Sequence, residues 1–276
     1  MIWSGHDDGS DVLIVVNQDP WRLRRTHSTI CALEAGRWRV AVASPHSETL
    51  PPRFKHVHIG TRTESESLRW ASAVVARNLM RIGVTVLTLF PERYRLPAIA
   101  GLAIRLFGLR GLLRTLREDA PAVIIVHDAL LVAPVLHHRS GSRVVFDARE
   151  YFPKQFEQSF IWRVMVGSGM HRLMREVLPK CDAVTAVSDG LRDGYRRLAK
   201  VDPVVVLNVP GRATPARKIG EARSPDAPVS LVYHGRVNTN RGLDHLVEAA
   251  FHVGHDLGQL FQHRVDFARG GVKGAL

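Results

Sequence analysis

The sequence contains few of the residues that cross-link small domains or bind metals in them. Cys31 and Cys181 are its only cysteines, which excludes a disulfide framework and a thiolate metal site. Two isolated thiols fit a reducing compartment, so we expect a cytoplasmic protein, with a peripheral place on the inner face of the membrane as a further expectation. The first residues also lack the basic region and apolar run of a secretory signal.

Uncharged hydrophobic runs of membrane-spanning length, about 18 residues or more, are missing as well. The apolar stretch from Ala120 to Leu136 is broken by His127 and Asp128, and we expect no segment to cross a bilayer. Aromatic residues are scarce at 7%. This scarcity argues against a nucleic-acid partner.

Positive charge and apolar residues are abundant. The 276 residues are 45% apolar and carry a net charge of +12, a composition typical of a globular protein. The charge favours phosphate-bearing or anionic-surface partners, unless it reflects only an arginine-rich composition spread along the chain.

Short apolar runs without polar alternation indicate strands that are buried on both faces. Segments long enough for a helix separate most of them. We therefore predict an α/β fold, a Rossmann-like, doubly wound, mainly parallel sheet, followed by an incomplete second α/β unit. The predicted strands are Val12–Val16, Val40–Ala43, Val123–Val126, Val144–Phe146, Ala183–Val187, Val204–Leu207 and Leu231–Tyr233.

Composition changes after the strand that ends at Leu207. Residues 208–228 are rich in proline and mixed charge, which is typical of a linker. We predict a Rossmann-like domain over 1–207, this linker, the start of a second Rossmann-like domain over 229–251, and a divergent or poorly packed tail over 252–276.

Two segments have amphipathic helical spacing. In Ser67–Arg81, Leu68, Ala71, Val75 and Leu79 recur at helical spacing, which predicts a helix packed on the sheet. The region Leu102–Arg117 is a basic amphipathic helix. It either covers the sheet with its arginines in water or lies in an anionic membrane interface.

Polar residues at strand ends are the candidate site, because ligands bind beyond the carboxyl ends of parallel strands. His127 and Asp128 follow the strand Val123–Val126. The imidazole of His127 suits proton transfer or a hydrogen bond to a sugar hydroxyl, and His127 is our candidate catalytic residue. The alternative is a histidine that only ends the strand.

Further candidates follow the next two strands. Asp147 and Glu150 come after Val144–Phe146. They form either a carboxylate pair for glycoside hydrolysis or ion pairs and loop contacts with Arg149. Ser188 follows Ala183–Val187 and suits a helix cap. Asp128, Glu150 and Ser188 are the candidate cleft residues.

The strongest phosphate signal is the turn from His234 to Gly242. Arg236 and Arg241 lie there between a predicted strand and a predicted helix, so that two guanidiniums could hold a diphosphate near a helix N-terminus. The alternative is a solvated basic turn. No P-loop or dinucleotide motif is present, and we expect neither a metal site nor a cofactor.

Several segments together resemble the N-terminal half of a GT-B glycosyltransferase of the retaining family 4. They occur in the family's order. They are Val12–Val16 with Arg24–Arg25, Ala32–Gly36, Ile125–Asp128, Phe146–Glu150, Thr185–Ser188, Val206–Pro210, Tyr233–Arg236 and Arg241–Leu243.

This resemblance implies a retaining, nucleotide-sugar-dependent transferase of the hexosyltransferase type. The sugar would pass to a polysaccharide or glycolipid acceptor. The implied partners are a nucleotide sugar as donor substrate, a glycan or lipid-linked acceptor and an anionic membrane, with no nucleic acid. His127 matches the family histidine that contacts the donor sugar, and Arg236 and Arg241 match the pair that contacts the diphosphate.

The sequence also departs from the family. The first loop, 17–22, has no glycine, and the chain has no glutamate beyond Glu248, where the family has a donor-binding pair. We therefore expect a chain truncated within its donor domain, with activity on its own left open. The alternative is a non-catalytic acceptor- or membrane-binding remnant of such an enzyme.

Overall fold

The computed structural model describes residues 10–21, 23–46, 49–60, 66–160, 162–209 and 242–256. Contacts divide the chain into two units, Met1–Pro210 and Gly211–Leu276. In the second unit the described residues include one helix, α8, Leu243–Asp256. The predicted linker 208–228 and the predicted strand Leu231–Tyr233 lie almost wholly outside the described residues, so the predicted domain bounds stay predictions.

The first unit is built on a parallel sheet of seven strands in the order β3-β2-β1-β4-β5-β6-β7. Every pair of neighbours is parallel. This confirms the predicted α/β, doubly wound fold. The strands are β1 Val12–Val15, β2 Val40–Ser44, β3 Lys55–His58, β4 Val123–Val126, β5 Arg143–Ala148, β6 Ala183–Ala186 and β7 Val204–Val205.

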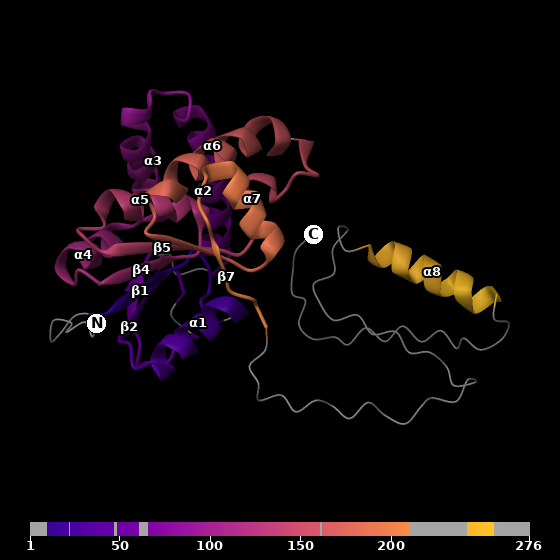
Figure 1. Cartoon of the computed structure of the whole chain (residues 1–276), viewed down its shortest axis with the longest axis horizontal. Coiled ribbons are helices and arrows are strands. Elements are labelled where there is room, and N and C mark those ends of the chain that lie inside the picture. The colour runs from indigo at the N-terminus through magenta and orange to yellow at the C-terminus, as the bar shows by residue number, and fades with distance from the viewer. Residues whose placement is uncertain are drawn as a thin grey trace. The chain divides into compact units, whose positions relative to one another are not determined.

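Side chains of the central strands alternate between two apolar clusters, one on each face of the sheet. In β1, Leu13 and Val15 belong to the larger cluster, whereas Val12 and Ile14 join Ile30 of the helix α1, Arg24–Ala35, in the smaller one. Figure 1 shows α1 on one side of the sheet. On the other side it shows α2 (Glu66–Leu87), α3 (Glu92–Phe107) and α5 (Ala129–His138). Burial on both faces explains the unbroken apolar runs.

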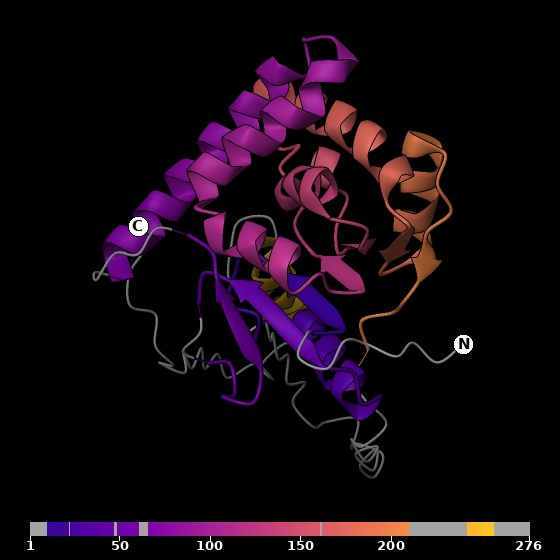
Figure 2. The ribbon, with the colours of Figure 1, turned by 90° about the vertical axis from the view of Figure 1, so that its left-hand side faces the viewer.

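Helices connect the strands on both sides. In Figure 2, α2 and α3 lie side by side along one flank of the unit. The helices are α1 Arg24–Ala35, α2 Glu66–Leu87, α3 Glu92–Phe107, α4 Arg110–Glu118, α5 Ala129–His138, α6 Gly167–Val177 and α7 Asp189–Ala199. Three shorter helical segments are η1 Phe152–Lys154, η2 Trp162–Val166 and η3 Leu178–Lys180.

Two elements have no counterpart among the predicted ones. Strand β3, with the sequence Lys-His-Val-His, is polar because it lies at the sheet edge and only Val57 is buried. Helix α5 is apolar almost throughout, so it shows no helical periodicity. Its central position, covered on all sides, is the reason.

The predicted basic helix over Leu102–Arg117 is two helices. Gly108 separates α3 from α4 with φ of +58°, and a Cβ there would fall 2.7 Å from the carbonyl oxygen of Gly60. Ile99, Ala103, Leu112 and Leu116 are buried, so these helices cover the sheet and the membrane-facing alternative for them is wrong.

Helix α2 presents a face different from the predicted one. Val75 and Leu79, expected to pack on the sheet, are exposed, whereas Met80 and Val84 are fully buried. The contacts of α2 with α3 and α6 set this rotation. Gly169 of α6 allows the approach, because a Cβ would lie 2.3 Å from Oγ1 of Thr85.

Among the described residues no single helix is long and apolar enough to cross a membrane. The pair α3 and α4 passes the same test of length and composition together, but it is bent by 118° at the break.

Candidate functional site

Four of the predicted site residues follow strands at the carboxyl edge of the sheet: His127, Asp128, Glu150 and Ser188. The strand order reverses between β1 and β4, and such a switch point is where open parallel sheets usually bind ligands. His127 directly follows β4, and its backbone N–H donates to the carbonyl oxygen of Val15 at 3.0 Å. The sequence therefore placed His127 on the correct edge of the sheet.

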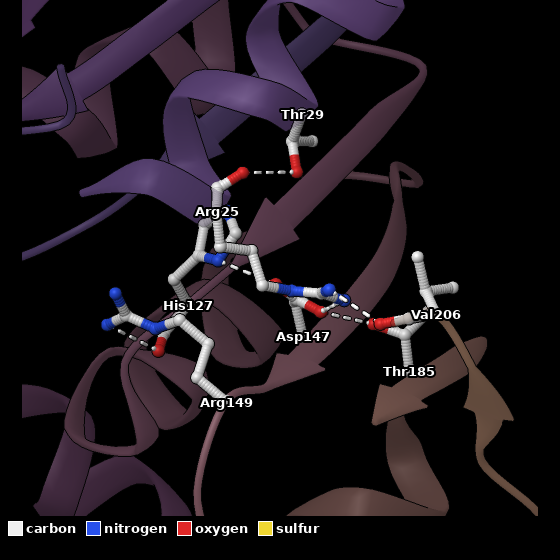
Figure 3. A network of polar contacts seen from close by, with 7 residues as sticks. All are labelled: Arg25, Thr29, His127, Asp147, Arg149, Thr185 and Val206. Carbon is white, nitrogen blue, oxygen red and sulfur yellow. Dashed lines mark hydrogen bonds and ion pairs between the residues drawn. The ribbon is translucent and has the colours of Figure 1, made fainter. Parts of the chain in front are cut away.

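The carboxylate of Asp147, at the end of β5, is the centre of a buried polar network (Figure 3). Arg25 of α1 donates two hydrogen bonds to it, from Nε at 2.8 Å and from Nη2 at 2.5 Å. The hydroxyl of Thr185 on β6 donates a third, and Nδ1 of His127 lies 2.9 Å from Oδ2. Arg25 also donates from Nη1 to the carbonyl oxygen of Val206 at 2.6 Å.

This network ties together segments far apart in the sequence: α1, the ends of β4, β5 and β6, and the residue after β7. Both the guanidinium of Arg25 and the carboxylate of Asp147 are buried. Removing one partner would leave the other as an uncompensated buried charge, so the network is a strong structural constraint.

Burial and hydrogen bonding act in opposite directions on Asp147. Burial would raise the pKa of its carboxyl group, but the hydrogen bonds from Arg25, from the imidazole of His127 and from Thr185 hold that pKa far below its ordinary value. The carboxylate is therefore ionised throughout the physiological range.

Burial lowers the pKa of His127, although Asp147 opposes the shift. The imidazole is therefore neutral near pH 7, and the nearby carboxylate favours the tautomer with the proton on Nδ1. His127 is 0% exposed, and its Nε2 has no hydrogen-bond partner within the part of the chain that the structure describes. A solvent-borne substrate cannot reach this nitrogen in the observed conformation, and the catalytic role of His127 stays a prediction.

Two predicted cleft residues cap helices. The side chain of Asp128 accepts a hydrogen bond from the N–H of Leu130 at 2.9 Å at the start of α5. Ser188 accepts one from the N–H of Leu191 at 3.3 Å at the start of α7. Both geometries satisfy backbone donors that a helix start otherwise leaves unpaired. Contacts of these residues with a ligand stay predictions.

Glu150 belongs to a second polar cluster on the loop after β5. Its carboxylate accepts a hydrogen bond from Gln155 Nε2 at 2.7 Å. Burial of the carboxyl group raises its pKa, and Asp128 adds to the increase, whereas Arg149 and Arg81 oppose it. The partner of Asp147 is thus Arg25, while Glu150 lies in a separate group of charges.

The remaining predicted residues, Arg236 and Arg241, lie outside the described residues, so the diphosphate site stays a prediction. Within the described residues no group of three or more His, Cys, Asp or Glu side chains is placed to hold a metal ion.

Sequence reasoning missed the pairing of Arg25 with Asp147. The two residues are 122 positions apart, and no local spacing relates them. The one available signal was an acidic residue at the end of a buried strand, which requires a partner of opposite charge or strong hydrogen bonds.

Comparisons with known proteins do not support the glycosyltransferase resemblance. No family model and no curated protein matches this chain. The solved structures it matches include tryptophan synthase α-subunits of Pyrococcus furiosus: a mutant α-subunit at 16% identity and TM-score 0.21, covering 73% of this chain and 88% of that one. A second match, a tryptophan synthase complex, has 14% identity and TM-score 0.20, with 72% and 88% covered.

These low scores carry no argument about what the chain does. Because no family model and no curated protein matches the chain, the prediction of a family 4 GT-B enzyme that uses a nucleotide sugar, or of a truncated remnant of one, is without support and is corrected. The physical reason lies in the segments behind the resemblance. Within the described part of the chain, most of them are short strands and the polar residues that follow them, which many doubly wound sheets share.

Proposed function

We propose that the protein is a peripheral membrane-binding protein whose helix α2 lies against an anionic lipid surface. One observation carries the proposal: an apolar stripe on α2 that faces solvent. Val75, Leu79, Ile82 and Val86 form this α2 stripe and are 41–57% exposed.

The spacing of the α2 stripe supports a single contact face. Its members recur at intervals of four, three and four residues, which places them on one side of a helix. The turn after the helix extends the apolar surface with Leu89 and Phe90, both exposed. Contiguous exposed apolar surface of this kind is unusual in a protein that binds nothing there.

The expected free energy of burying the α2 stripe is suited to reversible membrane binding. Burying the exposed half of one aliphatic side chain contributes on the order of 1 kcal/mol. Four to six such side chains, before the loss of motional freedom, give affinity typical of interfacial helices that bind weakly and reversibly.

Charge favours a lipid surface over a second copy of the chain. Arg93 lies just beyond Phe90, and Arg163 belongs to η2, which packs against α2; both side chains are exposed. Each lysine or arginine near an anionic leaflet adds roughly 1 kcal/mol. A second copy would bring the same net charge of +12 instead of a complementary one.

The inner leaflet is anionic and the two cysteines are free thiols, so we place the protein on the cytoplasmic side.

Vesicle sedimentation tests the proposal. We expect the full chain to bind phosphatidylcholine vesicles containing phosphatidylserine more tightly than pure phosphatidylcholine. L79Q/V86Q should weaken this binding about tenfold, since polar amides replace two inserted side chains. The matched control is V247Q, because Val247 of α8 is a helical valine of similar exposure, 53% against 50% for Val86.

Two results would overturn the proposal. One is equal vesicle binding by the wild type and L79Q/V86Q. The other is a wild-type dimer, seen by analytical ultracentrifugation, that L79Q/V86Q dissociates while vesicles bind neither form.

A further inference from the structure

Three adjoining hollows form one groove between α6, α7 and η1. Their volumes are about 460, 460 and 390 Å³, and all three are lined by His171. Tyr151 and Lys154 line both of the larger hollows. Arg175 and Arg197 each line the smallest hollow and one of the two larger ones. Shared walls of this kind make the hollows one continuous feature, which we call the α6–α7 groove.

The walls of the groove carry charge of one sign. Lys154 comes from η1, Arg172 and Arg175 come from α6, and Arg197 with the following Lys200 comes from the end of α7. Among the described residues no aspartate or glutamate lines any of the three hollows. All five cationic side chains belong to exposed residues.

Most of these cations have no carboxylate partner. In the described part of the chain, no ion pair joins Arg172, Arg175, Arg197 or Lys200 to an acidic side chain. Among the described residues Lys154 pairs only with Glu157, at 3.4 Å in an exposed contact.

The opposite face of α7 shows the usual outcome for its arginines. Arg192 and Arg196 both lie close to the carboxylate of Asp202, at 3.0 and 3.2 Å. Glu92 and Glu176 border a neighbouring hollow together with Arg172 and Arg175. Among the described residues no ion pair joins either carboxylate to these two arginines, and Glu176 is within ion-pair distance of Arg95 and Lys180. The groove cations are thus left without the neutralisation that nearby cations receive.

The backbone adds to the positive potential at one end of the groove. Gly190 and Leu191 in the first turn of α7 line it, where the helix dipole is positive. A Cβ on Gly190 would meet nothing within 4 Å, so this end is open to a ligand.

Helix-dipole stabilisation alone does not account for the cluster. Basic residues are favoured in the last turn of a helix, which explains Arg175 in α6 and Arg197 in α7. It does not explain His171 and Arg172 earlier in α6, or Lys154 on η1, on the same walls. Like charges gathered from three elements repel one another, and a bound anion removes that repulsion.

We propose that the α6–α7 groove binds a small molecule carrying two or more phosphate groups. Guanidiniums hold phosphate oxygens through forked, charge-assisted hydrogen bonds, and lysines act as point charges beside them. A volume of several hundred Å³ suits a ligand of this size. The site is separate from the α2 stripe and does not depend on the proposed membrane contact.

Calorimetric titration of the full chain with inorganic pyrophosphate tests the proposal. We expect binding in the micromolar range that weakens with salt, and at least tenfold weaker binding in R175Q/R197Q, which removes one cation from each long wall. The matched control is R192Q/R196Q on the other face of α7, with less than a twofold change. Thermal unfolding of each variant verifies that it is folded.

A lipid arm separates two sources of the phosphate. If pyrophosphate binds and R175Q/R197Q leaves binding to vesicles containing phosphatidylinositol 4-phosphate, a lipid with two phosphates, unchanged, the ligand is a soluble phosphate compound. If pyrophosphate instead competes with the vesicles and R175Q/R197Q loses both, it is a lipid headgroup; either result supports phosphate recognition. Equal losses in both double variants, no heat with millimolar pyrophosphate, or binding of single-stranded RNA without pyrophosphate would overturn the proposal.

Discussion

The network around Asp147 and the α6–α7 groove differ in whether their charged side chains are paired and buried. In the network, Arg25 and Asp147 are both buried and neutralise each other through two hydrogen bonds. In the groove, Arg172, Arg175 and Arg197 are exposed and have no carboxylate partner among the described residues. A buried charge must be paired for the chain to fold, whereas an exposed charge can remain unpaired and available for a ligand. The buried network therefore reports on stability and the groove on binding.

Replacing Arg25 in the buried network should have the largest effect on stability. In R25M the carboxylate of Asp147 stays buried without its two guanidinium hydrogen bonds, and we expect the unfolding free energy to fall by about 3–5 kcal/mol in urea titrations. R24M, at an exposed neighbouring position, should change it by less than about 0.5 kcal/mol. A loss below about 1 kcal/mol in R25M would show that the network is not a structural constraint.

The pH dependence of stability should isolate His127. Its pKa is lowered in the folded state, so between about pH 6.5 and the folded value only the unfolded chain takes up the proton. Stability is thus present above about pH 6.5 and is lost as the pH falls. H127N keeps an N–H donor beside Asp147 but does not titrate.

We expect H127N to lose roughly 1–3 kcal/mol at pH 7.5, because the smaller side chain leaves a cavity. The difference in unfolding free energy between the wild type and H127N should shrink on acidification by up to about 1.4 kcal/mol per pH unit. Urea titrations from pH 7.5 to 5.5 measure this. Parallel curves for the wild type and H127N would contradict the prediction.

Lys200 allows stability and binding to be separated on the groove side. It ends α7 in the left-handed region, with φ of 59°, a conformation that glycine adopts at less cost. K200G should raise the unfolding free energy by roughly 0.5 kcal/mol, after the loss of a favourable charge at the helix end, while pyrophosphate binding weakens. K200Q should weaken binding without this gain in stability, and a K200G chain that binds normally would remove Lys200 from the site.

The smallest effect is expected for the stability of groove variants. R172Q/R175Q removes two exposed, unpaired cations, so the unfolding free energy should change by less than about 0.5 kcal/mol. A loss of several kcal/mol in denaturant titrations would show that these arginines are structural and would erase the contrast with Arg25.

Much of the sheet could be predicted from the sequence because a strand buried on both faces is recognisable from its local composition. Runs such as Val123–Val126 are apolar throughout since both faces of the strand are covered. Strand β3 has no such apolar run, because its edge position tolerates Lys55, His56 and His58. Apolar spacing in α2 was also visible, but the side on which Val75 and Leu79 would lie was not.

The candidate site was predicted in part. His127 and Asp147 lie at strand ends, as the apolar runs before them indicate, and Ser188 caps α7 as its residue type suggests. Most of the described segments that suggested a glycosyltransferase are also short strand ends, and for that reason they were not specific.

The amino-acid sequence by itself determined the fold class and the edge of the sheet at which polar groups gather, because hydrophobic period and strand ends are local properties. Only the tertiary structure decided which charges meet. Arg25 reaches Asp147 from another element and is neutralised, whereas Arg175 and Arg197 from two helices face a groove lined by no carboxylate among the described residues. Pairing depends on distances between segments remote in the chain, and residue order does not specify those distances.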